Sequence, residues 1–215
     1  MSVDLDAIVS YTTYGEYNHI TEYIQTRNLQ MRDLAASIQG KDELETVKAI
    51  LASQCREIRY PLDFLGRPST AHKVYLFPKY VFFVHHYTYG LPYMWRMPNQ
   101  IWTSRWAFCA GSSNLMTTLL RIKGIDAWTR LGAVLDTETG QLLGFHAWTE
   151  AEVFGPHFLL EGTVHPEPPP LVPVEDAYGG ALDITYDPFA IYDESFFDKD
   201  EEKLKKYSKL VKRFV

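Results

Sequence analysis

The feature that most constrains the fold is a helix-forming segment followed along the chain by three strand-forming segments. Residues 110–123, AGSSNLMTTLLRIK, show apolar side chains at helical spacing, basic residues in the last turn and Gly124 as a stop signal. The three strand-forming segments span residues 125–135, 141–154 and 157–164. Turn signals separate them, DTETG after the first and Gly155-Pro156 after the second. A helix that leads into an antiparallel meander predicts an α+β fold, in which the sheet has one buried and one more open face.

Two more helices are predicted before this unit, within residues 27–58. Apolar side chains recur at helical spacing up to Gly40, which follows as a stop signal. Asp42 with Glu45 three residues later resembles a capping box at the start of the second helix. Pro61 marks the end of that helix, because the residue before a proline avoids the helical region.

The last part of the chain combines a proline-rich segment with a charged one. We expect a loop or arm without regular hydrogen bonding at residues 165–180, HPEPPPLVPVEDAYGG, because proline lacks the backbone donor. Acidic residues precede basic ones over residues 198–213, which favours a terminal helix. The sequence therefore predicts a single domain over residues 1–215, with its core at about 29–164.

Composition and charge exclude several classes of protein. The 215 residues are 46% hydrophobic and 22% charged, which is typical of a globular chain and not of a disordered one or a coiled coil. The net charge is −6 and there is no basic tract, so we expect no binding to nucleic acid. The sequence has no apolar run of about 18 residues, so no association with a membrane is expected.

The cysteines and the N-terminal segment indicate the cellular compartment in which we expect the protein. Cys55 and Cys109 are too few to form a disulfide framework for a chain of this length. The first residues, MSVDLDAIVSYTTYGEY, have neither the basic nor the apolar region of a signal peptide. We therefore expect a cytoplasmic protein in which an unpaired cysteine is structural or catalytic.

Cys109 comes directly before the predicted helix of residues 110–123, and that position suits a nucleophile. The unpaired N–H groups and the positive end of the helix dipole favour a thiolate and can stabilise an oxyanion. His146, in GFHAWTE, is the candidate base, because a strand can hold an imidazole rigidly against the start of a helix. Glu161, in FLLEGTV, can orient that imidazole if the two strands form a hairpin at Gly155-Pro156.

The order of these sequence words resembles the transglutaminase-core branch of the papain-like cysteine enzymes. The words are the cysteine at a helix start, LLRIKGIDAW, HAWTE and LLEGT, and the resemblance covers residues 105–164 well and 29–60 weakly. It implies a papain-like α+β fold in which the helix that carries the nucleophile packs on an antiparallel β-sheet. It also implies thiol-dependent acyl transfer, with Cys109 as the nucleophile, His146 as the base and Glu161 as the orienting acid.

The sequence departs from that family in several places. Position 161 is Glu where the family usually has Asp, and FCAGSSN lacks the acid that many members carry after the cysteine. The segment 165–180 has no counterpart in the family. The chain also lacks the sandwich and barrel domains and a Ca²⁺ loop signature, which argues against a regulated cross-linking enzyme. No metal and no cofactor are expected.

Further side chains could contact a substrate or an oxyanion. Trp102 and Trp106 precede the cysteine and could wall an acyl site, and an indole N–H can donate to an oxyanion. Gln100 and Asn99 are alternative donors of the same kind, and Trp148 follows the candidate base by two residues. Packing in the core or at its rim is the alternative role for each of these residues.

The catalytic candidates also have structural interpretations. An isolated Cys109 could be buried packing, as we expect for Cys55 inside a helix. Glu161 could be an exposed acid on a strand, with His165 as a fallback partner for the site. His85-His86 are interpreted as structural, because neighbouring residues on a strand point to opposite faces and no third ligand follows at zinc spacing.

The sequence thus predicts a cysteine hydrolase or acyltransferase, and it favours a protease or amidase over a cross-linking enzyme. The expected partner is a peptide or protein amide substrate, and the oligomeric state is left open. Two alternatives remain. The aromatic stretch 75–106 suits an amidase or acyltransferase that acts on glycans or arylamines. The same fold could also be a non-catalytic module that binds a peptide or a partner.

Overall fold

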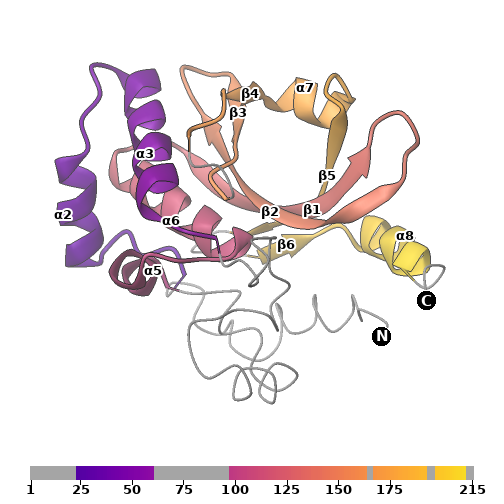
Figure 1. Ribbon diagram of the computed structural model, residues 1–215, viewed down its shortest axis with the longest axis horizontal. Helices are drawn as coiled ribbons and strands as arrows, with labels where there is room; N and C mark the ends of the chain where they lie inside the picture. Colours follow the sequence, from indigo (N-terminus) through magenta and orange to yellow (C-terminus); the bar gives the residue numbers. More distant parts are fainter. Residues whose placement is uncertain (1–22, 61–96, 164–166, 193–196, 212–215) are drawn as a thin grey trace, which may run out of the picture.

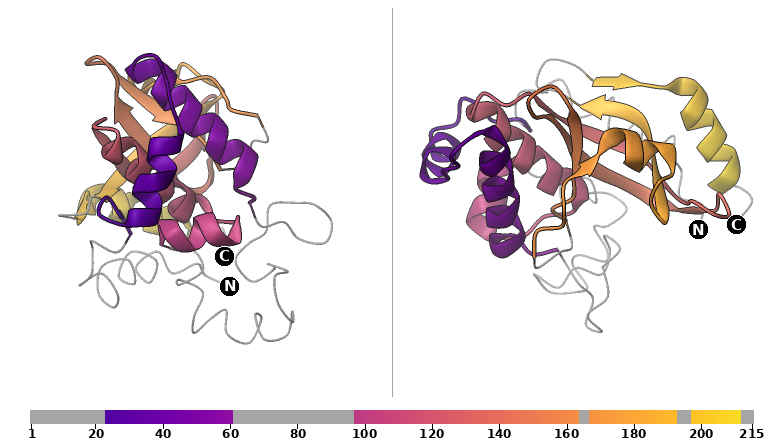
Figure 2. Two further views of the ribbon diagram at one scale, coloured as in Figure 1. Left: turned by 90° about the vertical axis from the view of Figure 1, so that its left-hand side faces the viewer. Right: turned by 90° about the horizontal axis from the view of Figure 1, so that it is seen from above.

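The computed structural model describes residues 23–60, 97–163, 167–192 and 197–211. Its centre is a six-stranded antiparallel sheet in the order β4-β3-β2-β1-β5-β6 (Figure 1). The strands are β1 (Ala127–Asp136), β2 (Leu142–Glu152), β3 (His157–Leu160), β4 (Val172–Pro173), β5 (Ile184–Tyr192) and β6 (Phe197–Lys199). The helices are α2 (Leu29–Ser37), α3 (Glu43–Glu57), α5 (Pro98–Ser104), α6 (Cys109–Ile122), α7 (Val174–Gly179) and α8 (Glu201–Val211). Helices α2, α3 and α5 gather at one end of the sheet, and α8 lies at the other (Figure 2).

The first two described helices lie within the predicted residues 27–58, and each begins at a side chain that caps it. The Asn28 side chain accepts a hydrogen bond of 3.2 Å from the backbone N–H of Met31 at the start of α2. The Asp42 side chain accepts one of 2.8 Å from the N–H of Glu45 at the start of α3. Each cap satisfies a backbone donor that has no partner within the helix, so both helices start at a defined residue.

The predicted helix and meander are both present. Helix α6 begins at Cys109, one residue earlier than predicted, and the left-handed Gly124 (φ 81°) follows its end. Strand β2 pairs antiparallel with β1 on one side and with β3 on the other. Gly155 (φ 104°) lies in the turn between β2 and β3. The prediction of an α+β fold, with the cysteine-bearing helix packed on an antiparallel sheet, is confirmed.

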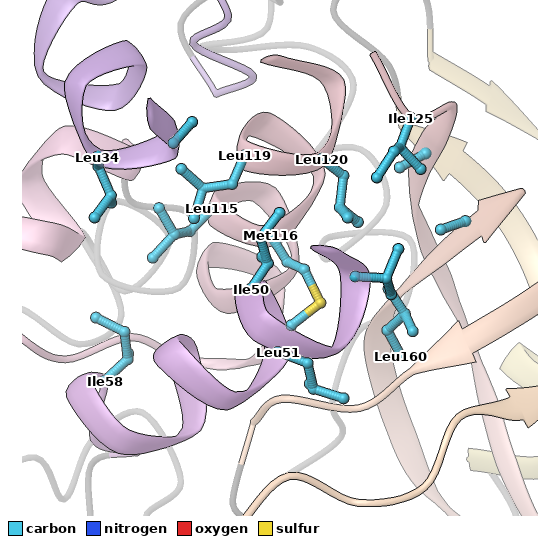
Figure 3. Close-up of a cluster of buried hydrophobic side chains, with 14 of the residues drawn as sticks. Leu34, Ile50, Leu51, Ile58, Leu115, Met116, Leu119, Leu120, Ile125 and Leu160 are labelled. Carbon is cyan, nitrogen blue, oxygen red and sulfur yellow. The ribbon is translucent and has the colours of Figure 1, made fainter. Parts of the chain in front are cut away.

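The main core lies between α6, α3 and the buried face of the sheet (Figure 3). Its largest fully buried aliphatic side chains from the two helices are Ile50, Leu51, Leu115, Met116, Leu119 and Leu120. Leu160 joins this cluster from the end of β3, and Ile125 joins it just before β1. Burying side chains of this size stabilises the fold by about 1.5–3 kcal/mol each, so α6 is held firmly against the sheet.

Alternation along β2 separates its side chains onto two faces of the sheet. Thr149 faces α6, because its hydroxyl donates a hydrogen bond of 3.1 Å to the backbone carbonyl of Ser113. His146, Trp148 and Glu150 therefore share the other face, where Trp148 packs against α7. This second face carries the polar side chains that concern function.

The proline-rich segment departs from the prediction. Residues 172–179 form strand β4 and helix α7, so the expectation of a loop without regular bonds is wrong for this part. Pro173 (φ −54°) ends an edge strand and caps α7, and a missing N–H is tolerated at both positions. Glu175 and Asp176 suit the first turn of the helix, and the left-handed Gly180 (φ 77°) ends it.

The predicted C-terminal helix is present as α8, which packs on β5. Tyr207 is fully buried and donates a hydrogen bond to Asp187 on β5. The Nζ atom of Lys203 lies 2.6 Å from the same carboxylate, which is partly buried rather than solvated. No helix in the described part of the chain is long and apolar enough to cross a bilayer.

Candidate active site

Cys109 is the first residue of α6, and its surroundings leave it partly accessible. Its side chain is partly buried and packs against a cluster formed by Tyr23, Ile24, Ala110 and Ala147. Phe108 precedes it in an extended conformation and caps the helix without a side-chain hydrogen bond. The N–H groups of the first turn have no acceptor within the helix, and N–H groups at such a position can bind an anion beside the sulfur.

His146 and Glu161 form a close pair at the end of the β2–β3 hairpin. The imidazole Nε2 and the carboxylate Oε2 lie 2.5 Å apart, and the two side chains are 21% and 14% exposed. The other carboxylate oxygen accepts a hydrogen bond of 2.9 Å from the backbone N–H of Thr163. Glu161 therefore has both oxygens engaged and can hold the imidazole in one orientation.

The electrostatics of the pair favour the charged imidazole. Burial opposes the positive charge on His146, but the Glu161 carboxylate and a hydrogen bond with Cys109 outweigh it, so the pKa of His146 lies well above its ordinary value. Burial also opposes the negative charge on Glu161, yet His146 and the Thr163 hydrogen bonds bring the pKa of Glu161 below its ordinary value. Because Nε2 is engaged by the carboxylate, Nδ1 is the ring nitrogen left for the thiol.

The segment after Glu161 is held against the start of α6. A Cβ at Gly162 would lie 2.7 Å from Met116 Cε and 2.8 Å from Gln54 Nε2, so any larger residue would require these two side chains to shift. Gln54 Nε2 donates a hydrogen bond of 2.6 Å to the hydroxyl of Ser112. These contacts fix the carboxylate and the cysteine-bearing helix relative to each other, and sequence reasoning missed Gly162 and Gln54. The spacing EGT after a strand is a weak signal that could have pointed to the glycine.

Tyr60 is a third residue that sequence reasoning missed. Burial raises the pKa of its hydroxyl, and the nearby negative charges of Cys109 and Glu161 raise it further. Its ring meets the ring of Phe108 edge to face, with 5.6 Å between centroids. A hydroxyl that stays protonated beside the sulfur is a potential hydrogen-bond donor to a bound carbonyl. Its distance of 49 positions from Cys109 along the chain left no local signal.

The five predicted contact residues lie in different surroundings. Trp106 is buried and meets the ring of Phe108 edge to face at 6.1 Å between centroids, beside the start of α6. Trp148 is fully buried, and its ring stacks on the imidazole of His146 with a centroid separation of 6.4 Å. Gln100 is exposed near the start of α5.

Trp102 lies in a groove lined by α2, α3 and α5, below the guanidinium of Arg105 at 3.6 Å from the ring centroid. The lining of that groove includes none of the three catalytic candidates, so packing is the role that its surroundings support. Asn99 donates its backbone N–H to the Gln25 side chain. These two residues therefore tie α5 to its neighbours.

The remaining candidates are a buried cysteine and residues that lie outside the described part of the chain. Cys55 is buried in α3, and burial together with the Glu161 charge raises the pKa of its thiol to about 11. His85-His86, His165 and most of the aromatic stretch 75–106 lie outside the described residues. Among the described residues, no group of three or more His, Cys, Asp or Glu side chains is arranged to hold a metal ion.

Comparisons with known proteins add little to this geometry. No protein-family model matches the chain, and no curated protein matches it. A solved structure described as a "putative protease" from Parabacteroides distasonis aligns with a TM-score of 0.43 and 12% identity, over 68% of this chain and 26% of that one. A second, a "putative cysteine protease" from Cytophaga hutchinsonii, aligns with a TM-score of 0.43 and 17% identity, over 91% of this chain and 59% of that one. This chain thus spans about a quarter and about three fifths of their lengths. Both TM-scores are below 0.5, so the assignment of the site depends on the chain's own residues.

Proposed function

We propose that this chain is a thiol-dependent hydrolase of amide or peptide bonds, in which Cys109 is the nucleophile, His146 the acid and base, and Glu161 the orienting acid. The observation that carries the proposal is one imidazole bound on both sides. Its Nε2 atom lies 2.5 Å from a carboxylate oxygen, and Cys109, at the first position of a helix, is close enough to the ring to help raise the pKa of His146. That is the arrangement of a thiol nucleophile activated by an oriented base.

In the first half of the reaction, the Cys109 thiolate adds to the carbonyl carbon of the substrate amide. The carbonyl oxygen becomes an oxyanion, which the N–H groups of the first turn of α6 stabilise. The C–N bond then breaks as His146 gives its Nδ1 proton to the leaving nitrogen. The products of this half are a free amine and a thioester on Cys109.

In the second half, the now neutral His146 accepts a proton from water at Nδ1. The water oxygen attacks the thioester carbonyl, the C–S bond breaks, and a carboxylic acid leaves. The imidazolium and the thiolate are thereby restored. Glu161 keeps the ring in place throughout and stabilises its positive charge when the proton resides there.

Water is the acyl acceptor that we infer, in preference to an amine. His146 is 21% exposed and Cys109 is partly exposed, so water has access to the thioester. An enzyme that transfers the acyl group to an amine has to exclude water at this step. The partial exposure of both groups therefore supports hydrolysis over cross-linking.

The test compares the chain's two thiols at neutral pH. Cys109 should react with iodoacetamide much faster than Cys55, whose thiol is buried and holds its proton up to a pKa of about 11. We expect Cys109→Ala to abolish both the fast labelling and the cleavage of a fluorogenic peptide-amide library. Cys55→Ala is the matched control and should leave both unchanged. Fast labelling at Cys55, or labelling of Cys109 no faster than that of free cysteine at pH 6, would overturn the proposal.

A further inference from the structure

Helix α7 contributes a side chain to the surroundings of His146, although the proposed reaction gives this helix no role. The indole N–H of Trp148 donates a hydrogen bond of 3.1 Å to the hydroxyl of Tyr178 in α7. Trp148 in turn stacks on the imidazole of His146, with ring planes 27° apart. The proline-rich segment, which contains α7, thus reaches the candidate base His146 through one intermediate side chain, that of Trp148.

The indole of Trp148 has little room to move. It is fully buried, and a Cβ at Gly132 would come within 2.4 Å of its Cη2 atom. The ring of Tyr186 meets the indole edge to face at 5.1 Å between centroids. The hydrogen bond to Tyr178 adds a directional restraint to this packing, so the plane against which the His146 ring lies is fixed.

Tyr178 is itself anchored on a buried carboxylate. Its hydroxyl donates a hydrogen bond of 3.0 Å to Glu150, whose side chain is only 3% exposed. Arg130 binds the same carboxylate with two nitrogens, at 2.7 and 3.2 Å, and His157 Nδ1 lies 2.8 Å from it. Burial and the Glu150 charge raise the pKa of Tyr178, so the hydroxyl keeps its proton as donor.

We propose that Tyr178 is a positioning residue for His146 and acts through Trp148. This inference rests on the proposed function, because it concerns the base of that reaction. The imidazole must stay aligned with Glu161 at Nε2 and with the sulfur at Nδ1, and a fixed indole face limits the rotation that would break either alignment. The chain from Glu150 to His146 therefore couples the proline-rich segment to the thiolate–imidazolium pair.

The experiment removes one hydroxyl and follows the thiol rather than a substrate. In Tyr178→Phe the ring remains and the restraint on Trp148 is lost. We expect the iodoacetamide reaction of Cys109 at neutral pH to slow by about threefold to tenfold, the size of one hydrogen bond. The acid limb of its pH profile should move to higher pH, because a misaligned imidazolium stabilises the thiolate less.

Tyr207→Phe is the matched control. Tyr207 also donates its hydroxyl to a carboxylate, Asp187, which a lysine binds as well, but it holds α8 and has no contact with Trp148 among those described here. Tyr207→Phe should lower the melting temperature about as much as Tyr178→Phe does, and it should leave the pH profile of the Cys109 reaction unchanged. Trp148→Phe should reproduce the Tyr178→Phe profile, and the double variant should be no worse than either single one.

The outcomes separate this inference from the proposed function. If wild-type Cys109 reacts rapidly and Tyr178→Phe has the same pH profile, the inference fails and the proposed function stands. If wild-type Cys109 is inert, the proposed function fails. The inference about Tyr178 is then tested by the NMR signal of the His146 ring, which is assigned with His146→Gln. Tyr178→Phe should still change the chemical shift and the titration of that signal. An unchanged signal would overturn the inference in that case too.

Discussion

The β2–β3 hairpin carries two histidine–carboxylate pairs on one face, and they have opposite surroundings. In one pair His146 lies on β2 and Glu161 follows β3. In the other the order is reversed, with Glu150 on β2 and His157 on β3. In the strand register Glu152 lies opposite His157, so the contact between His157 and Glu150 is diagonal. The same register, continued to Glu161, makes the contact between His146 and Glu161 diagonal as well. One hairpin geometry therefore produces both contacts.

The pairs differ in what else binds the carboxylate. Arg130 neutralises Glu150 with two contacts, and Tyr178 donates to it as well, so His157 is one partner among several and is 39% exposed. Among the described residues, no lysine or arginine forms an ion pair with Glu161, so the positive charge that balances it has to reside on His146. The comparison teaches that Arg130 supplies the positive charge beside Glu150, whereas Glu161 depends on His146 for its counter-charge.

The largest expected difference comes from removing each histidine. His146→Ala takes away the proton acceptor and donor of the reaction, and we expect peptide-amide cleavage to fall by about 10²–10⁴-fold. His157→Ala leaves Glu150 paired with Arg130, and cleavage should stay within about threefold of wild type. Initial rates on the fluorogenic library measure both. Equal losses in the two variants would contradict the distinction between the pairs.

Removing each carboxylate charge should separate chemistry from stability. Glu161→Gln leaves the imidazolium without its counter-charge, so cleavage should fall by about 10–10³-fold, while much of the fold's stability remains. Glu150→Gln leaves Arg130 without its buried partner and should lower the free energy of unfolding by about 3 kcal/mol. Urea denaturation and initial rates distinguish the two. A stability loss at Glu161→Gln as large as that at Glu150→Gln would argue that both pairs are structural.

The smallest effect is a dependence of stability on pH. The pKa of His146 is raised on folding, so its charged form contributes stability that is complete below the ordinary value of 6.5 and is lost as pH rises through the raised value. The gap in unfolding free energy between wild type and His146→Gln should therefore narrow above pH 6.5, by at most about 1.4 kcal/mol per pH unit. Denaturation at pH 6 and pH 9 measures it. A gap that widens with pH would mean that the neutral ring is the stabilised form.

Much of the local structure could be predicted, because the signals are close together in the chain. Asp42 caps α3 three residues before Glu45, and Gly124 ends α6, since both effects involve neighbouring backbone groups. The turn at Gly155 was visible for the same reason. Helix α7 was missed because five prolines dominate its segment, although none follows Pro173. Tyr60 was missed because its contact with the cysteine-bearing helix is distant in sequence.

The sequence by itself determined helices α2, α3, α6 and α8, strands β1, β2 and β3, and the hairpin that brings His146 and Glu161 together. Periodicity, caps and turns specify these features over a few residues. Only the tertiary structure decided that α6 brings its first turn to His146 and that Arg130 binds Glu150 rather than Glu161. Those outcomes depend on packing between distant segments and on how deeply each charge is buried, and neither is encoded in local spacing.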